Sequence, residues 1–288
     1  MNILDLGGHS GCGIYLIETE DGSIFVRKIS KDPAYNSRLQ AQCAKQRCFV
    51  STHIYTPAVM GEGFDEDGRF YFDMEYIQGV TLAEYIKTME IGKIKSLVAT
   101  LLTIIDPCKT EQIAEKDQPQ ARFLAKLADL QDNLKTENNA HVSIAMKLLK
   151  SHDWTNTPSS GCHGDLTLEN IIVRNDQLYL IDFLDSFYDS WVLDMGTLLQ
   201  DVQTMWSYRN AGSVSMNTTL RLLVFRDLLL DAVKQIDSRY IKEIYYALLM
   251  KLVRIYPYTT DALTLGFLDE KLEQVIGCIR TIEEGAQL

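Results

Sequence analysis

The sequence lacks the features that define several protein classes. No apolar run approaches the roughly 20 residues that a membrane-spanning helix needs, so we expect no membrane segment. The six cysteines are scattered without a C-x-x-C pair, which favours reduced thiols over a disulfide framework. The first residues, MNILD, show neither the basic nor the apolar region of a signal peptide. These absences together predict a cytoplasmic protein.

Positive charge is also scarce. The chain has 28 Lys and Arg against 39 Asp and Glu, a formal net charge of −11. A nucleic-acid binder needs a basic face to displace counterions from phosphates, so nucleic acid is excluded as a partner, and docking on an anionic membrane is disfavoured. The same charge is compatible with a cationic small-molecule substrate. The 46% hydrophobic and 23% charged residues are ordinary for a globular protein, and 288 residues suffice for two lobes.

The first part of the chain has the pattern of short strands joined by turns, with β-branched and aromatic residues between Gly and Asp. A polar helix is predicted over residues 36–50. The predicted strands cover residues 14–18, 23–29, 58–62 and 69–76.

From Thr81 onward the apolar residues recur mostly at helical spacing, with breaks near Pro107 and Pro119. The clearest helical runs are residues 81–86, 94–102, 220–233, 241–253 and 263–282. We therefore predict an α+β protein with two lobes: a β-rich N-lobe over residues 1–76 and a larger, mostly helical C-lobe over residues 77–288.

The most informative segment is CHGDLTLENIIV, followed by YLIDF. It places Asp165, Asn170 five residues later and Asp182 twelve residues after that among strand-forming apolar residues. Phosphoryl transfer needs positioning and neutralisation of charge, and Mg²⁺ prefers hard oxygen ligands such as those of Asn170 and Asp182. Asp165 would accept the proton of an attacking hydroxyl. The spacing matches the catalytic and metal-binding motifs of kinase-type sites. We expect His163 to make hydrogen bonds within the loop.

Two features upstream suit the nucleotide. The turn from Gly7 to Gly13 can present backbone amides to phosphate, and we assign Gly8, Ser10 and Gly11 to that contact. Lys28 follows on the second predicted strand, where a kinase-like site needs an ammonium group that reaches the α- and β-phosphates.

The segment MEYIQG lies where the pattern changes from strands to helices. A nucleotide bound between two lobes needs a connecting segment whose main chain pairs with the base. We assign those contacts to the main chain of Glu75 and Ile77, with Met74 at the back of the pocket. Main-chain contacts leave both ATP and GTP open as the nucleotide.

With these motifs the chain resembles the aminoglycoside phosphotransferase and choline kinase family, the small-molecule branch of the protein-kinase-like fold. The resemblance is specific from Gly161 to Asp194. It implies Asp165 as catalytic base, Asn170 and Asp182 as Mg²⁺ ligands, and Lys28 on the phosphates of ATP. Asp194 matches the Asp that opens the helix after the metal-binding turn, and we expect it to support the catalytic loop.

Spacing separates this branch from the protein kinases. Asp194 comes twelve positions after Asp182, and no Ala-Pro-Glu follows. No room is left for an activation loop and a peptide-docking segment, so we expect the hydroxyl of a small molecule as acceptor. An aminoglycoside, choline or a related amino alcohol, and a sugar all stay open.

The chain departs from the kinase pattern in one respect. Kinase-like folds usually pair the strand lysine with a Glu on the first helix, but no Asp or Glu occurs between Pro33 and Gly61. Gln42 and Gln46, one helical turn apart, are the available partners of Lys28. The alternative hypothesis is therefore a catalytically weak or inactive nucleotide-binding module that regulates a partner.

Overall fold

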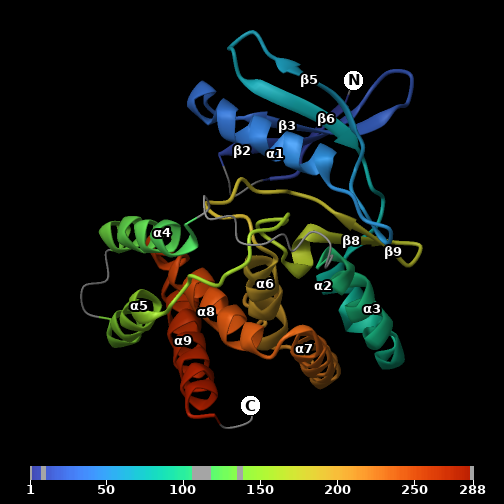
Figure 1. The fold of residues 1–288 in the computed structure, drawn as a ribbon. Coiled ribbons are helices and arrows are strands. Elements are labelled where there is room, and N and C mark those ends of the chain that lie inside the picture. Colours follow the sequence, from blue (N-terminus) through green and yellow to red (C-terminus); the bar gives the residue numbers. More distant parts are fainter. Residues whose placement is uncertain (1, 8–10, 106–117, 135–138, 286–288) are drawn as a thin grey trace. The chain divides into compact units, whose positions relative to one another are not determined.

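A computed structural model describes residues 2–7, 11–105, 118–134 and 139–285 (Figure 1). The chain forms two compact units. The first unit comprises Met1–Leu82, His163–Asp165 and Glu169–Ser186, and the second comprises Ala83–Cys162, Leu166–Leu168 and Phe187–Leu288. Among the helices in the described part of the chain, none has the length and apolar character needed to span a bilayer. The α+β class predicted from the sequence is confirmed.

The first unit contains a five-stranded antiparallel sheet with the order β1-β2-β3-β6-β5. Its strands are β1 (Asn2–Asp5), β2 (Cys12–Glu18), β3 (Ile24–Ser30), β5 (Val59–Phe64) and β6 (Phe70–Glu75). β3 and β6 alternate between buried and partly exposed residues, as expected for strands with one face on a core.

Helix α1 (Asn36–Cys48) lies across one face of this sheet (Figure 1). It follows the short 3₁₀ turn Pro33–Tyr35, in which the amide of Ala34 donates to the side chain of Asp32. Leu39 and Cys43, one turn apart, are buried against the sheet. The core between α1 and the sheet consists of Cys12, Val26, Leu39, Cys43, Phe70, Phe72 and Met74.

A second sheet in the same unit has the order β4-β9-β8-β7. Its strands are β4 (Ile54–Tyr55), β7 (Val80–Thr81), β8 (Ile171–Arg174) and β9 (Gln177–Leu180). β8 and β9 form a hairpin closed by Asn175 and Asp176, both at positive φ. Such a turn matches the twist of the flanking strands, and Asn and Asp tolerate the left-handed conformation.

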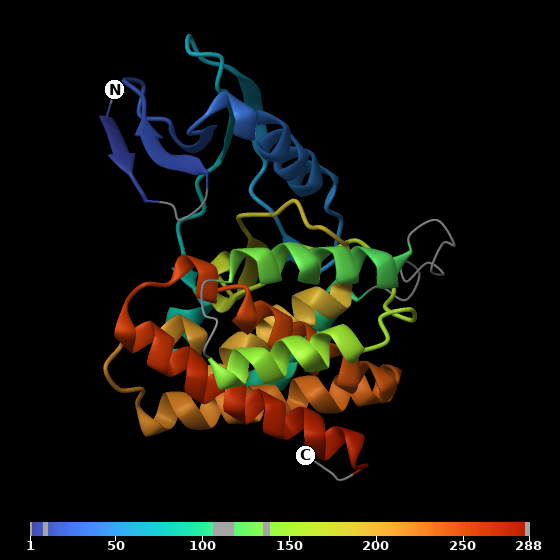
Figure 2. The same ribbon diagram turned by 90° about the vertical axis from the view of Figure 1, so that its left-hand side faces the viewer.

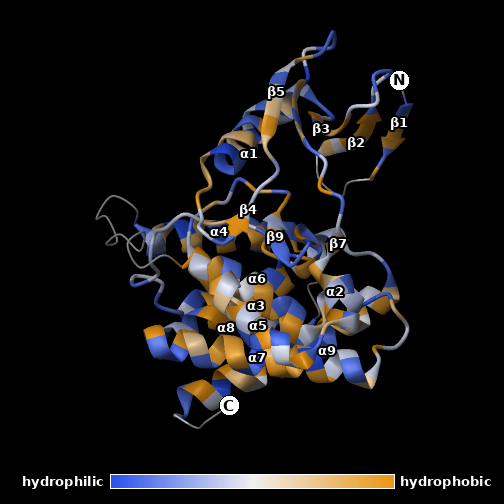
Figure 3. Ribbon diagram, turned by 90° about the vertical axis from the view of Figure 1, so that its right-hand side faces the viewer, coloured by the Kyte–Doolittle hydropathy of each residue, from blue (hydrophilic) through white to orange (hydrophobic). Residues whose placement is uncertain are grey.

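The second unit is helical. Its helices are α2 (Leu82–Thr88), α3 (Ile94–Leu101), α4 (Pro119–Asn133), α5 (Ala140–Ser151), α6 (Trp191–Thr204), α7 (Met216–Ile236), α8 (Arg239–Val253) and α9 (Ala262–Glu283). Figure 2 shows α4, α5 and α9 as successive neighbours. Figure 3 shows both apolar and polar residues on α7 and α9. The buried residues of each helix recur mostly every three or four positions, so each helix buries one apolar face.

Helices α6 and α8 form the centre of this unit, because 13 of the 14 residues of α6 and 11 of the 15 residues of α8 are buried. Gly196 permits their close approach: a Cβ there would lie 2.7 Å from the Cβ of Ala247.

The predicted helix over 36–50 and the four predicted strands are present within a few residues of their predicted limits. Strands β1, β4 and β7, which are two to four residues long, were not predicted from the sequence. Cys12 and Gly13 were predicted to lie in a turn, whereas both belong to β2. The lobe boundary between residues 76 and 77 stays a prediction.

Candidate active site

The β8–β9 hairpin determines which site residues lie together. Asn170 is the last residue of the 3₁₀ turn that leads into β8, and Asp182 comes two residues after β9 ends. Because a hairpin returns the chain to its starting point, the two residues lie at the same end. The amide of Ile181 donates to the carbonyl of Asn170 at 3.0 Å, and the amide of Leu184 donates to the carbonyl of His163 at 3.0 Å. These bonds join residues 163–170 to residues 181–184.

The Asn170 side chain links the two ends of the predicted catalytic loop. Its Nδ2 donates to the backbone carbonyl of Asp165 at 2.8 Å and to Asp165 Oδ2 at 3.3 Å. With Nδ2 engaged in this way, Oδ1 is the Asn170 atom that can ligate a cation. Asp165 and Asn170 are both half-buried.

His163 organises the loop, as the sequence analysis predicted. Its side chain is fully buried, Nδ1 accepts from the amide of Asp165 at 3.2 Å, and Nε2 lies 2.8 Å from the carbonyl of Ile181. Nδ1 must be unprotonated to accept, so Nε2 carries the hydrogen and donates to Ile181. The imidazole ring also packs on Phe183 with centroids 4.4 Å apart. Both ring nitrogens are therefore engaged in holding the backbone of Asp165 beside the turn that contains Asp182.

Gly164 meets a conformational and a steric requirement. Its φ is +94°, a region that residues with a Cβ rarely adopt. A Cβ at this position would lie 2.5 Å from Ser186 Oγ and 2.8 Å from the carbonyl of Leu184. The glycine of the His-Gly-Asp motif thus lets the predicted catalytic loop approach the segment after Asp182.

Asp182 has a left-handed backbone conformation, with φ at +61°. This conformation costs more for a residue with a side chain than for glycine, and it persists here because the flanking hydrogen bonds fix the turn. The Asp182 side chain is 30% exposed, and its Oδ1 pairs with Nζ of Lys28, which is 2% exposed. The structure therefore brings the predicted phosphate-binding lysine onto a predicted metal ligand.

Lys28 has a second partner on α1. Its Nζ donates to Gln42 Oε1 at 2.8 Å. Gln46, the other candidate from the sequence, instead donates from Nε2 to the carbonyl of Pro57 at 2.9 Å and contacts Met74 Sδ. Gln42 is thus the residue in the position where other kinase-like chains have a Glu.

The donor set fits a cation that is bound together with phosphate. Asn170 Oδ1 and the Asp182 carboxylate are hard oxygen ligands of the kind that Mg²⁺ takes. Within the described residues no group of three or more His, Cys, Asp and Glu side chains could hold a metal ion. Magnesium sites of nucleotide enzymes typically use one or two protein ligands and complete the shell with phosphate oxygens and water. The residues present match that kind of site better than an all-protein cage.

The structure places only part of the predicted nucleotide contacts. Gly8 and Ser10 lie outside the described residues. The carbonyl of Gly11 accepts from the amide of Lys31 at 2.9 Å. The remaining three residues belong to the end of β6 and the segment after it: Met74 and Ile77 are buried, and the amide of Glu75 donates to the carbonyl of Ala58 at 2.9 Å. A base contact from Glu75 must therefore come from its carbonyl.

The sequence analysis missed Asp201. This fully buried carboxylate on α6 accepts the amide of Leu168 on Oδ2 at 2.6 Å, and on Oδ1 the amide and hydroxyl of Ser207 at 2.8 and 2.7 Å. It therefore makes, at Leu168, the type of contact that we predicted for Asp194. Asp194 lies two turns earlier on the same helix and is also fully buried. The sequence signal for Asp201 was a second acidic residue, seven positions after Asp194, in the same apolar helix.

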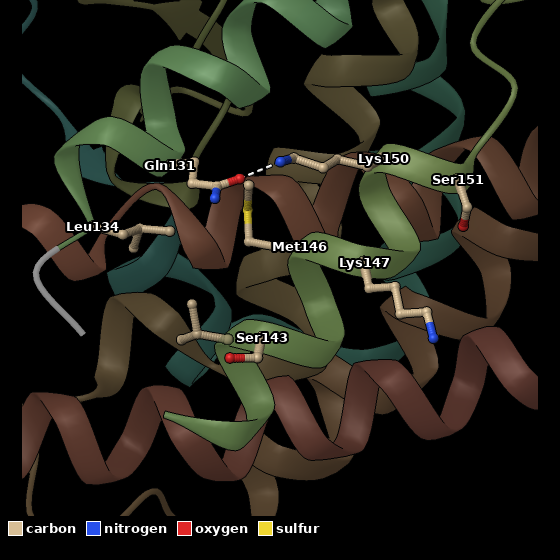
Figure 4. A pocket seen from close by; sticks show the side chains of 8 residues that line it. Gln131, Leu134, Ser143, Met146, Lys147, Lys150 and Ser151 are labelled. Carbon is tan, nitrogen blue, oxygen red and sulfur yellow. Dashed lines mark hydrogen bonds between the residues drawn. The ribbon is translucent and has the colours of Figure 1, made fainter. Parts of the chain in front are cut away.

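A pocket of about 730 Å³ lies between α4 and α5 in the second unit (Figure 4). α4 contributes Gln131, the residue directly after α4 contributes Leu134, and α5 contributes side chains that include Met146, Lys147 and Lys150. Lys150 pairs with the side-chain oxygen of Gln131 across the pocket. Both lysines are exposed.

Comparison with known proteins places this geometry in context. The sequence model of the phosphotransferase enzyme family (APH) matches residues 8–219. No curated protein sequence matches the chain significantly.

Solved structures resemble the chain over almost its whole length at low sequence identity. A thermostable mutant of aminoglycoside phosphotransferase APH(4)-Ia has a TM-score of 0.65 at 13% identity, with 96% of this chain and 94% of that one covered. The amicoumacin kinase hAmiN, in complex with AMP-PNP, Ca²⁺ and Ami, has a TM-score of 0.62 at 15% identity and coverage of 95% and 87%. The GDP and kanamycin complex of APH(2″)-IIia gives 0.60 at 14% identity, covering 96% and 93%. At such identities the likeness shows the shared fold.

Proposed function

Since this chain belongs to the phosphotransferase enzyme family and is a small-molecule kinase, we propose that it transfers the γ-phosphoryl group of ATP to a hydroxyl group of a small polar acceptor. The observation that carries this proposal is the linked set of Asp165, Asn170, Asp182 and Lys28, which side-chain and backbone hydrogen bonds connect within one compact unit.

Asp165 is the proposed general base. The acceptor oxygen attacks the γ-phosphorus, the bond from that phosphorus to the bridging oxygen of ADP breaks, and the hydroxyl proton passes to the Asp165 carboxylate. The half-buried carboxylate keeps access to solvent, so the proton can then leave to water. His163 and Asn170 hold Asp165 in place through its amide and its carbonyl.

Lys28, Asn170 and Asp182 are the proposed phosphate and metal residues. The Lys28 ammonium would move from Asp182 to the phosphates, and Asn170 Oδ1 and the Asp182 carboxylate would hold Mg²⁺. When bound, the cation neutralises charge that develops on the phosphate oxygens. The amicoumacin kinase complex with AMP-PNP and Ca²⁺ supports the use of a nucleotide with a divalent cation.

We propose a polyhydroxylated or amine-bearing acceptor. The net charge of −11 favours a cationic molecule, and related folds have been solved with hygromycin B and with kanamycin. Amino alcohols and neutral sugars satisfy the same hydroxyl chemistry, so they belong in the same test. The GDP complex of a related fold places GTP beside ATP as a donor to test.

The test is ADP release over a panel of aminoglycosides, amino alcohols and sugars, with ATP or GTP and Mg²⁺. We expect release above the acceptor-free rate with at least one acceptor, together with a product heavier by one phosphoryl group in mass spectrometry. The control is Asp165→Asn, which keeps the side-chain volume and removes the base. We expect its kcat to fall about 10³-fold with nucleotide binding retained.

Two results would count against the proposal. Nucleotide binding without ADP release for any acceptor would favour the regulatory module. Wild-type turnover in Asp165→Asn would show that another group takes the proton.

A further inference from the structure

Lys28 is a buried cation beside a helix that carries no acidic residue. Its side chain is 2% exposed, and a buried charge needs a compensating partner. The helix packed beside it, α1, supplies none, because its ionisable side chains are Arg38, Lys45, Arg47 and two cysteines. In protein kinases a Glu of the first helix pairs with the strand lysine, whereas here the α1 side chain that contacts Lys28 is that of Gln42.

The Gln42 amide is fixed in orientation by partners on both sides. An ammonium can only donate, so Oε1 faces Lys28, and Nε2 donates to the hydroxyl of Tyr35 at 3.2 Å. The Tyr35 ring occupies the space beside Gly11, where a Cβ would lie 2.7 Å from the ring. Gln42 is 1% exposed. It therefore orients Lys28 firmly but adds no charge.

The neighbouring acidic groups are engaged elsewhere. Burial, reinforced by the hydrogen bond to Glu62, raises the pKa of the Cys43 thiol to about 11, so Cys43 is neutral at physiological pH. Glu62 itself pairs with Arg47 at 2.8 Å. The carboxylate that contacts Lys28 is that of Asp182.

We propose that Gln42 is a positioning residue that makes binding of the divalent cation depend on the nucleotide. Because Gln42 leaves the Lys28 charge uncompensated from the helix side, Lys28 holds Asp182 in the metal-free protein. Lys28 releases Asp182 when nucleotide phosphates take the ammonium. The protein therefore binds the cation weakly without the nucleotide and more tightly with it. This inference rests on the proposed function of Lys28 and Asp182 as phosphate and metal residues.

A substitution series at Gln42 tests the inference without turnover. The probe is Mn²⁺ alone, with no nucleotide, and free Mn²⁺ is measured by electron paramagnetic resonance. Gln42→Glu gives Lys28 a permanent carboxylate and frees Asp182, so its Mn²⁺ affinity should rise about 10-fold over the wild type. Gln42→Met removes the second acceptor of Lys28 and strengthens its hold on Asp182, so its affinity should fall below the wild type. Gln40→Glu makes the same charge change at an exposed position of α1 and is the matched control.

A Mn²⁺ affinity that falls from Gln42→Glu to the wild type and again to Gln42→Met supports the inference. A purely structural role of Gln42 would instead weaken Mn²⁺ binding in both variants. An unchanged or weaker affinity in Gln42→Glu, or an equal gain in Gln40→Glu, overturns it. If Gln42→Glu does not fold, Lys28→Met serves in its place: it removes the ammonium that competes for Asp182 and should tighten Mn²⁺ binding. Unchanged or weaker binding there also overturns the inference.

Failure of the proposed function would look different. The wild type would then release no ADP and bind no Mn²⁺ even with ATP present, whereas failure of the inference leaves both intact.

Discussion

Two regions of this molecule could be considered for a ligand, and they differ in how their polar groups are held. In the segment from His163 to Leu184, the side chains of His163 and Asn170 bond to backbone groups of the same segment at 2.8 to 3.2 Å, and His163 is fully buried. The pocket between α4 and α5 has a volume of about 730 Å³, but its lysines, Lys147 and Lys150, are exposed.

The difference shows that pre-organisation, more than volume, marks a reaction site in this chain. A long exposed lysine side chain loses conformational entropy when it is fixed on a ligand. The Asp165 carboxylate and the Asn170 amide have their neighbours fixed before any substrate binds, which is what electrostatic catalysis of phosphoryl transfer requires. Substitutions in the two regions should therefore have very different effects.

The largest effect is expected at Asp182. Asp182→Ala removes the proposed metal ligand and leaves the buried Lys28 without its carboxylate. We expect kcat to fall about 10³-fold and the Mg²⁺ dependence of nucleotide binding to disappear, as measured by isothermal titration with and without Mg²⁺. A metal titration identical to that of the wild type would contradict the role of Asp182.

The next effect is expected at Gly164. Gly164→Ala introduces a Cβ at positive φ and against Ser186 and the carbonyl of Leu184, so the catalytic loop must shift. We expect a loss of about 10²-fold in kcat, because small displacements of a reacting group are costly. Gly161→Ala is the matched control, since a Cβ there meets nothing within 4 Å. Equal kcat in the two variants would show that the loop tolerates the displacement.

The smallest effect is expected in the α4–α5 pocket. The double variant Lys147→Ala with Lys150→Ala removes both ammonium groups at exposed positions, where single contacts contribute little. We expect kcat and KM for nucleotide and acceptor to stay within about twofold of the wild type. A large rise in KM for the acceptor would assign the pocket to substrate binding and contradict the expected difference between the two regions.

The sequence predicted the parts of the site that depend on local pattern. The spacing of Asp165, Asn170 and Asp182 around a strand-forming segment is a chain-local signal. The hairpin that joins them, which turns at Asn175 and Asp176, was not among the predicted elements. The helix and strands of the first unit followed from the same kind of pattern.

Contacts between distant segments were not predictable in this way. Gln42 and Gln46 are equivalent in sequence, one turn apart and both buried, and their different partners depend on how α1 packs on the sheet. The role of Asp201 at Leu168 likewise depends on the tertiary position of α6. The strands β4 and β7 have two residues each, and such short strands are defined by their partners in the sheet.

We propose that Asp165 acts as a base and that the phosphoryl group is transferred in one direct step. The stereochemistry at phosphorus tests this mechanism. An Asp that acted as a nucleophile would form a phosphoenzyme and transfer the group twice. With ATP made isotopically chiral at the γ-phosphorus and the acceptor identified by the panel, a single in-line displacement predicts inversion of configuration in the product. Retention of configuration would contradict direct transfer with Asp165 as the base.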